Sequence, residues 1–300
     1  MSVQDFDAWL ATRCAHVEQA LADSLPADAP AGLCDVMRYA VLGEGKRLRP
    51  LLVLATAEAL GGLPDAALRA ACAVEIIHAY SLVHDDLPCM DDDVLRRGQA
   101  TAHVKFGEAR ALLAGDALQA LAFELLTPAE AGGVPAAMQA GLCRLLAQAA
   151  GAAGMAGGQA IDLASVGRRL DVTQLRHMHQ LKTGALLLGS VRLGRACALQ
   201  PVSAPVWQAL DNYGTAIGLA YQVVDDILDA TVASEQLGKT AGKDAAQDKP
   251  TYVSLLGLAE ARALAQRLRD QALQALDEGG INRESGHLHA LADRLIHRNN

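Results

Sequence analysis

The segment His84-Asp85-Asp86-Leu87-Pro88-Cys89-Met90-Asp91-Asp92-Asp93 places five aspartates within nine residues, directly after an apolar run. A second acidic cluster, Asp225-Asp226-Ile227-Leu228-Asp229, follows another apolar run far downstream. Carboxylates are costly to desolvate without partners, so acids on largely apolar helices need an explanation. A single cluster of this kind is explained equally well by a helix that ends in solvent. Two clusters, accompanied by basic motifs, favour a metal site.

The spacing of the aspartates indicates which of them can act together. Asp225 and Asp229 are four residues apart, so on an α-helix they share one face and can bind one cation. Asp85 and Asp91 are six residues apart, but Pro88 between them disrupts the helix and lets Asp91 return toward Asp85. Carboxylate oxygens without nearby cysteine or histidine pairs suit Mg²⁺ before Mn²⁺. Because Mg²⁺ usually binds one or two carboxylates and completes its shell with waters and phosphates, the two clusters predict a cradle for a diphosphate.

Composition favours an all-α protein. Of the 300 residues, 51% are hydrophobic but only 3% are aromatic, and the mix suits packed helices better than sheets. No alternating strand pattern of convincing length is present. We expect one domain over residues 1–300, with antiparallel helices around a central cavity; the alternative is two domains divided near residue 130. The net charge of −8 and the lack of a broad basic stripe argue against a nucleic-acid partner.

Prolines and glycine pairs divide the predicted helices. We expect Gly157-Gly158 to separate helices and residues 234–249 to form a polar loop. In the first third of the chain we predict helices over residues 5–25 and 33–42, a helix that ends near Gly61-Gly62, and a long helix that begins at Pro64-Asp65. Further helices are predicted over residues 105–126, 134–151 and 172–199, one after Pro205, and two at the C-terminus.

Cysteine use and the N-terminal sequence indicate a cytoplasmic protein. The six cysteines are scattered, with no metal-ligand spacing, as expected of small buried residues in a reducing compartment. The N-terminus carries acids where a signal peptide carries bases. We find no apolar run of about 18 residues, so we expect no membrane span.

Basic residues occur near the acidic clusters, and each has two interpretations. Lys46, Arg47 and Arg49 lie in a loop between glycine and proline, where they are either solvated or a phosphate clamp. Arg96-Arg97, directly after the first cluster, has the same two interpretations. His78 lies two helical turns before Asp85 on the same face, which favours a site residue over an ordinary helix histidine.

Two further basic segments fit a bound polyanion. Lys182-Thr183-Gly184 interrupts an apolar helix, where a lysine needs either a buried anion or a route to water. Lys239, Lys243 and Lys249 are either solvated or part of a lid that closes over an anion.

Taken together, these motifs identify a resemblance to the trans-prenyltransferases of the polyprenyl (isoprenyl) diphosphate synthase family, and most to its bacterial farnesyl-diphosphate-forming members. The resemblance extends from about residue 30 to Arg298. Besides the two acidic clusters, the matching blocks are Gly45–Pro50, His78–Pro88, Arg96–Gly98, His103–Gly107, Ala114–Ala117, Gly157–Gln159, Lys182–Ala185, Tyr221-Gln222 and the segment from Gly238 to Tyr252.

The resemblance implies an activity and a set of roles. Such enzymes join an allylic diphosphate (dimethylallyl, then geranyl) to isopentenyl diphosphate and release pyrophosphate. By analogy, Mg²⁺ would be bound by Asp85, Asp91, Asp225 and Asp229, helped by Asp86. Arg96, Lys182, Lys239 and Lys249 would surround the leaving group, and Thr183 and Gln222 would border the reacting carbon. Isopentenyl diphosphate would be held by Lys46, Arg49, His78 and Arg97. The implied fold is the all-α isoprenoid synthase fold, usually a homodimer.

Product length is predicted from the residues that precede the first aspartate. Ser81 and Tyr80 lie four and five residues before Asp85, about 6–8 Å below the metal by helical rise. A bulky Tyr80, together with the insertion Pro88-Cys89, implies a C15 product by family resemblance, with geranyl diphosphate (C10) as the alternative. Ala100, Val224 and Val253 depart from residues usual in the family, but none replaces a predicted metal ligand or phosphate-binding residue.

Three other interpretations remain open. A terpene cyclase would share the fold but would need no second diphosphate site, so Lys46, Arg49 and Arg97 argue against it. A non-catalytic subunit of a hetero-oligomeric synthase typically lacks one acidic cluster, and both are present here. A helical scaffold would leave the basic motifs unexplained.

Overall fold

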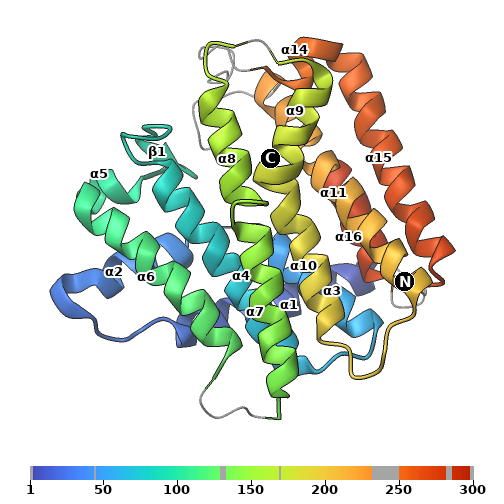
Figure 1. The fold of residues 1–300 in the computed structure, drawn as a ribbon, viewed down its shortest axis with the longest axis horizontal. Helices are drawn as coiled ribbons and strands as arrows, with labels where there is room; N and C mark the ends of the chain where they lie inside the picture. Colours follow the sequence, from blue (N-terminus) through green and yellow to red (C-terminus); the bar gives the residue numbers. More distant parts are fainter. Residues whose placement is uncertain are drawn as a thin grey trace.

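The computed structural model describes residues 3–43, 45–128, 133–168, 170–231, 250–281 and 286–297. Its helical elements are α1 (Val3–Ser24), η1 (Pro30–Gly32), α2 (Leu33–Val41), α3 (Leu48–Ala59), α4 (Pro64–Asp85), α5 (Ala102–Phe106), α6 (Glu108–Leu126), α7 (Ala136–Ala150), α8 (Met155–Ala164), α9 (Val172–His179), η2 (Gln180–Gly184), α10 (Ala185–Ala196), α11 (Ala204–Thr231), α14 (Tyr252–Leu256), α15 (Leu258–Glu278) and α16 (His287–Ile296). Long helices run side by side, and the carboxyl ends of α4 and α11 point toward the same end of the molecule (Figure 1). Both acidic clusters therefore lie at that end.

Helix α4 is a core helix. It begins at Pro64, whose fixed φ suits the first helical position, and most of its residues are buried. One window of this helix is long and apolar enough to cross a membrane (mean hydropathy 1.4), contrary to our expectation of no such run. However, 78% of that window is buried inside the protein, as is typical of a core helix.

The buried apolar residues form two clusters that meet at α3 and α10. Helices α2, α4, α6 and α7 surround the first cluster, and α11, α15 and α16 surround the second. On α10, Leu186 contributes to the first cluster and the next residue, Leu187, to the second. Because these two helices present apolar side chains on both faces, they hold the two halves of the helix assembly together.

Several predicted boundaries differ from the structure. Gly157 and Gly158 lie inside α8 instead of separating helices, and the segment predicted as one helix over 105–126 divides at Gly107, which has a φ of 90°. Among the described residues after 250 there are three helices, α14, α15 and α16, where two were predicted. A short hairpin, β1 (Leu95–Arg96) and β2 (Gln99–Ala100), was not predicted, since two-residue strands leave no alternating pattern.

Candidate active site

After α4 the chain turns back on itself, which brings Asp91 to Asp85. The backbone N–H of Asp91 donates to the Asp85 carbonyl oxygen at 2.8 Å, and the N–H of Asp92 donates to the Leu87 carbonyl at 3.2 Å. Asp92 adopts a left-handed φ of 50°, which aspartate tolerates better than most residues. The predicted return of Asp91 across Pro88 is confirmed.

The carboxyl group of Asp85 is in an environment that disfavours its charge. Burial raises its pKa to about 6, and the charge of Asp91 adds to this rise, whereas Lys182 opposes it. A buried carboxylate beside a second carboxylate gains most from a bound cation. The electrostatics at the end of α4 therefore suit a metal ion.

Asp86 and Arg96 bind each other. Arg96 donates from Nε to both carboxylate oxygens of Asp86, at 2.8 and 3.0 Å, and from Nη2 to Oδ1 at 2.6 Å. Asp86 is only 3% exposed. The sequence assigned Asp86 to the metal and Arg96 to the leaving group; in the structure they form an ion pair that ties the hairpin to the end of α4.

Lys182 and Thr183 lie in η2, a π-helical turn between α9 and α10. Such turns occur frequently at functional sites, and this one contains the Lys182-Thr183-Gly184 segment that interrupts an otherwise apolar helix. Two glycine contacts hold it in place. A Cβ on Gly158 would lie 2.0 Å from the Lys182 nitrogen, and a Cβ on Gly218 would lie 2.8 Å from the Gly184 Cα. Helices α8 and α11 therefore approach η2 with backbone nearly against backbone.

Lys182 connects several acids. Its Nζ lies 2.5 Å from Asp162 Oδ2 on α8. Burial lowers the pKa of Lys182, but the charge and hydrogen bond of Asp162 raise it above its ordinary value, helped by Asp85 and Asp91. Lys182 is therefore a firmly charged cation between α8 and the end of α4.

A chain of hydrogen bonds orients Thr183 and Gln222. Thr183 Oγ1 donates to Gln222 Oε1 at 3.0 Å, and Gln222 Nε2 donates to Asp226 Oδ1 at 2.9 Å. The other oxygen of Asp226 accepts from the backbone N–H of Tyr252 at 2.8 Å. Asp226 thus fixes which way the Gln222 amide points, and the two residues predicted to border the reacting carbon lie together.

The other two aspartates of the second cluster, Asp225 and Asp229, are half-buried on α11. His179, at the end of α9, is close enough for Asp225 to influence it. Burial lowers the pKa of His179 to about 4, while Asp162 and Asp225 oppose the shift. Asp162, Lys182 and His179 therefore lie close enough to interact electrostatically, and they link Asp85 and Asp91 to Asp225.

A separate group of cations surrounds His78. Arg49 lies in the first turn of α3, not in a loop as predicted; it is 8% exposed, and its Nε has no hydrogen-bond partner among the described residues. Burial lowers the pKa of Arg49, while Glu75 raises it. Burial lowers the pKa of His78 well below its ordinary value, and Arg49 and Arg97 lower it further. His78 is therefore a neutral side chain among cations.

Arg97 occupies the turn between β1 and β2. It has a left-handed φ of 53°, followed by Gly98 at 74°, as a tight hairpin turn requires. A Cβ on Gly45 would lie 2.9 Å from Arg97 Nη1, so glycine leaves space for the guanidinium beside the loop that carries Lys46. Of the predicted set, Arg49, His78 and Arg97 are brought together from α3, α4 and the hairpin, and Lys46 is exposed in the loop that precedes α3.

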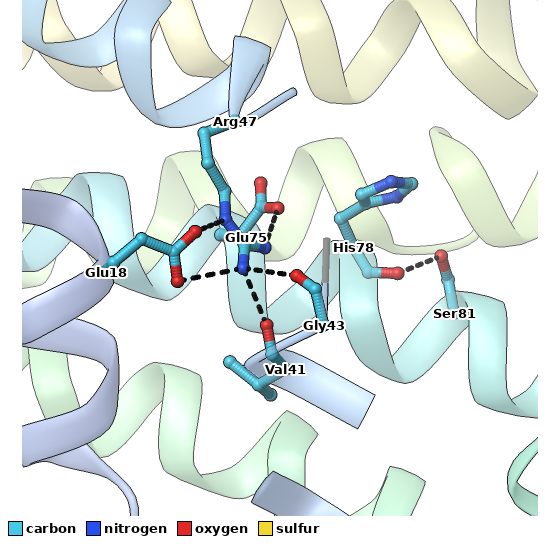
Figure 2. Close-up of polar contacts among 7 residues, drawn as sticks. All are labelled: Glu18, Val41, Gly43, Arg47, Glu75, His78 and Ser81. Atoms are coloured by element: carbon cyan, nitrogen blue, oxygen red, sulfur yellow. Dashed lines mark hydrogen bonds and ion pairs between the residues drawn. The ribbon is translucent and has the colours of Figure 1, made fainter. Parts of the chain in front are cut away.

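Arg47 has a different environment from its neighbours in the sequence. It is 3% exposed and lies between Glu18 of α1 and Glu75 of α4 (Figure 2). The sequence grouped it with Lys46 and Arg49 as a possible phosphate clamp, but the structure uses it as an internal ion-pair partner.

Of the two predicted chain-length residues, Tyr80 lies on the side of α4 that faces α6. Tyr80 packs edge-on against His84, with ring centroids 5.5 Å apart, and its hydroxyl hydrogen-bonds to the side chain of Gln119. Ser81 Oγ donates to the His78 carbonyl oxygen at 2.9 Å. A Cβ on Gly115 would lie 2.0 Å from His84 Nε2, so α6 packs tightly against the His84 ring that Tyr80 contacts.

Some predicted residues lie outside the described part of the chain, and some described ones were missed. Lys239, Lys243 and Lys249 are outside the described residues. No sequence motif singled out Asp162 and His179, which lie near the predicted residues, or Glu75, which binds Arg47. The only available signal for Asp162 and Glu75 was an acid on an otherwise apolar helix.

Comparisons with known proteins identify the family of the chain. The polyprenyl synthetase family matches residues 30–280. A probable farnesyl diphosphate synthase of Sinorhizobium fredii is 50% identical over 275 residues, covering 90% of this chain and 82% of that protein. The farnesyl diphosphate synthase of Escherichia coli is 48% identical over 266 residues, covering 88% of this chain and 89% of that protein.

A solved structure gives the same result for the fold. The geranyltransferase of Helicobacter pylori, in complex with magnesium and isoprenyl diphosphate, matches with a TM-score of 0.84 and 34% identity, covering 99% of this chain and 97% of that one. The predicted all-α isoprenoid synthase fold is confirmed.

Proposed function

The chain belongs to the polyprenyl synthetase family and is a prenyltransferase of the farnesyl diphosphate synthase type, and we propose that it condenses isopentenyl diphosphate with dimethylallyl and then geranyl diphosphate. The products would be farnesyl diphosphate and pyrophosphate. The observation that supports the proposal is the presence of two clusters of charged side chains with different chemistry. One is built from carboxylates around Lys182, and the other from Arg49, Arg97 and His78 without a predicted metal ligand.

The two sites suit two different diphosphates. A leaving diphosphate needs its growing charge neutralised, which acids holding divalent cations can provide. A diphosphate that is only held in place needs fixed hydrogen-bond donors, which arginine supplies in a planar fork. A terpene cyclase would have no use for the second site. Lys46, Arg49, His78 and Arg97 therefore favour a two-substrate enzyme.

We propose Mg²⁺ as the cation, with Mn²⁺ as a substitute. Asp85 and Asp91 would hold it at one side, with Asp225 and Asp229 at the other. The raised pKa of buried Asp85 fits a carboxylate placed to receive a cation. Bound there, Mg²⁺ would supply charge neutralisation to the departing pyrophosphate. We propose that Asp86 supports this site indirectly, through Arg96.

Lys182, Thr183 and Gln222 would act on the allylic substrate. Lys182, held by Asp162, presents positive charge toward Asp85 and Asp91, where the leaving diphosphate would bind. Gln222 uses its amide N–H for Asp226, which turns the amide oxygen toward Thr183. These oxygen dipoles can stabilise an allylic cation without attacking it, so no protein nucleophile is needed. Lys239 and Lys249 remain proposed contacts of the leaving group.

Product analysis tests the proposal. Purified protein is incubated with Mg²⁺ or Mn²⁺, labelled isopentenyl diphosphate and either dimethylallyl or geranyl diphosphate, and the dephosphorylated alcohols are sized by chromatography. We expect farnesol as the main product. Geraniol alone would support the C10 alternative with the same mechanism. No product from folded protein with any starter would refute the enzyme assignment in favour of a non-catalytic subunit.

We further propose that residues 1–300 act as one domain within a cytoplasmic homodimer. All six cysteines are free thiols, as a reducing compartment requires. Helix α6 exposes two consecutive large apolar residues, Leu112 and Leu113, at 46% and 55%, and Val104 on the preceding helix α5 is 51% exposed. Large apolar side chains left exposed on a surface can mark a protein interface. Light scattering coupled to size-exclusion chromatography should give twice the chain mass of 31.4 kDa, and a monomer would refute the dimer.

A further inference from the structure

Arg47 is one of the most extensively bonded side chains in the described structure. Its Nε lies 2.5 Å from Glu18 Oε1, and its Nη1 lies 2.7 Å from Glu75 Oε1 (Figure 2). Its Nη2 donates to Glu18 Oε2 at 3.1 Å and to the carbonyl oxygens of Val41 and Gly43, each at 2.9 Å. Every nitrogen of the guanidinium therefore has a partner inside the protein, which holds Arg47 away from a substrate-binding role.

The backbone of Arg47 is also unusual. It has a φ of 48°, in the left-handed region, where a non-glycine residue is strained by about 1–3 kcal/mol. Such strain persists where surrounding interactions overdetermine the conformation. Here the interactions are the two carboxylates and two carbonyls that hold the side chain. The residue directly precedes α3, whose first turn carries Arg49.

Glu75 connects Arg47 to the arginines that we propose to bind substrate. It is 4% exposed on α4, three residues before His78. The guanidinium of Arg97 lies beside that of Arg47, since a Cβ on Gly45 would be 2.9 Å from Arg97 Nη1 and 3.2 Å from Arg47 Nη1. Arg49 follows Arg47 by two residues, in the first turn of α3. In agreement with this placement, Glu75 raises the pKa values of Arg49 and Arg97 against the lowering effect of burial. A buried carboxylate that lost the cation it binds would pair with another arginine nearby, and these two are the arginines that we assign to isopentenyl diphosphate.

We propose that Arg47 is a positioning residue that binds Glu75 and thereby keeps Arg49 and Arg97 available for the diphosphate of isopentenyl diphosphate. The inference rests on the proposed function for the identity of that ligand. Glu18 completes the arrangement by binding the Nε side of Arg47 from α1, which holds the guanidinium against Glu75. Arg47 thus acts on the substrate only through Glu75, whereas Lys46 and Arg49, on either side of it, act directly.

The test is a double-mutant cycle with separate kinetics for the two substrates. In Arg47→Gln, Glu75 is released toward Arg49 and Arg97, so the KM for isopentenyl diphosphate should rise by about tenfold or more. The KM for geranyl diphosphate should change by less than about twofold, because that substrate binds at the acidic site. In Arg47→Gln/Glu75→Gln, the competing carboxylate is gone. The KM for isopentenyl diphosphate should then return to within about threefold of wild type.

Two further variants keep the test decisive. Arg69→Gln removes an arginine that binds Asp65 on the same helix, at 2.9 Å and partly exposed, and should leave both KM values within about twofold. If Arg47→Gln is too unstable to assay, Glu75→Gln alone retains Arg47 bound to Glu18 and the two carbonyls. It should give a KM for isopentenyl diphosphate at or below that of wild type.

The outcomes separate this inference from the proposed function. A purely structural role for Arg47 would leave the double variant as impaired as Arg47→Gln, or would raise both KM values equally, and either result would overturn the inference. A raised KM for isopentenyl diphosphate in Glu75→Gln would also overturn it. Wild-type protein that makes no prenyl product would instead refute the proposed function.

Discussion

Replacing Tyr80 with alanine is expected to lengthen the prenyl product. Tyr80 lies five residues before Asp85 on α4, about 7.5 Å from it along the helix axis. Its ring is fixed by the edge-on contact with His84 and by the hydrogen bond to Gln119. If the growing chain extends from the diphosphate along α4, this ring ends its path.

The structure gives the size of the change. Without the ring, the next side chains on the same side of α4 are Ile76 and Ile77, about 5–6 Å further along the axis and fully buried. That depth accommodates a further five-carbon unit, so the main product should shift from C15 to C20 or longer. Because Tyr80 is only half-buried, its truncation should lower the free energy of unfolding by about 1–3 kcal/mol, less than for a core aromatic.

The assay is chromatography of the dephosphorylated alcohols, after thermal unfolding has shown that the variant is folded. Tyr80→Phe is the matched control, since it keeps the ring and its contact with His84 and loses only the bond to Gln119. It should still make farnesol. Farnesol as the main product of folded Tyr80→Ala would show that another residue limits the chain, and the reasoning would be refuted.

Three other predictions test the site. Lys182→Met should lower kcat by about 10²–10³-fold, as does loss of one charge-stabilising donor in other enzymes, and an activity within threefold of wild type in steady-state kinetics would contradict its role. Because Asp85 has a pKa of about 6 without metal and must lose its proton to bind Mg²⁺, Mg²⁺ affinity should be constant above that pH. Below that pH, the affinity for Mg²⁺ should weaken by up to about tenfold per pH unit as the carboxyl group of Asp85 is protonated. Calorimetric titrations with Mg²⁺ at several pH values measure this dependence. An affinity that does not change with pH would show that Asp85 is not a ligand. Gly218→Ala would place a Cβ 2.8 Å from the Gly184 Cα and should lower both kcat and the free energy of unfolding, the latter by about 1–3 kcal/mol. Gly141→Ala, where a Cβ meets nothing within 4 Å, is its control and should be neutral or stabilising; equal effects of both substitutions on unfolding would disprove the packing argument.

The sequence by itself was sufficient for the fold class and for the two acidic clusters. Helical periodicity places Asp225 and Asp229 on one face of a helix. An uninterrupted helix would keep Asp91 away from Asp85, and Pro88 prevents the helix from continuing between them. These relations involve residues close in the chain, where backbone geometry alone decides which side chains meet. Resemblance to a known family then indicated the reaction from the order of short motifs.

Only the tertiary structure decided which charge binds which. Arg47 and Arg49 are two residues apart and chemically identical, yet Arg47 is bound by Glu18 and Glu75 and Arg49 has a buried nitrogen without a partner among the described residues. Similarly, the sequence assigned Asp86 and Arg96 separate roles, and the structure pairs them. Partner choice depends on carboxylates that come from distant helices, and their distances are set by packing that no local pattern encodes. A charge next to a motif can therefore be recognised in the sequence, but whether it binds the substrate or another side chain is decided by the fold.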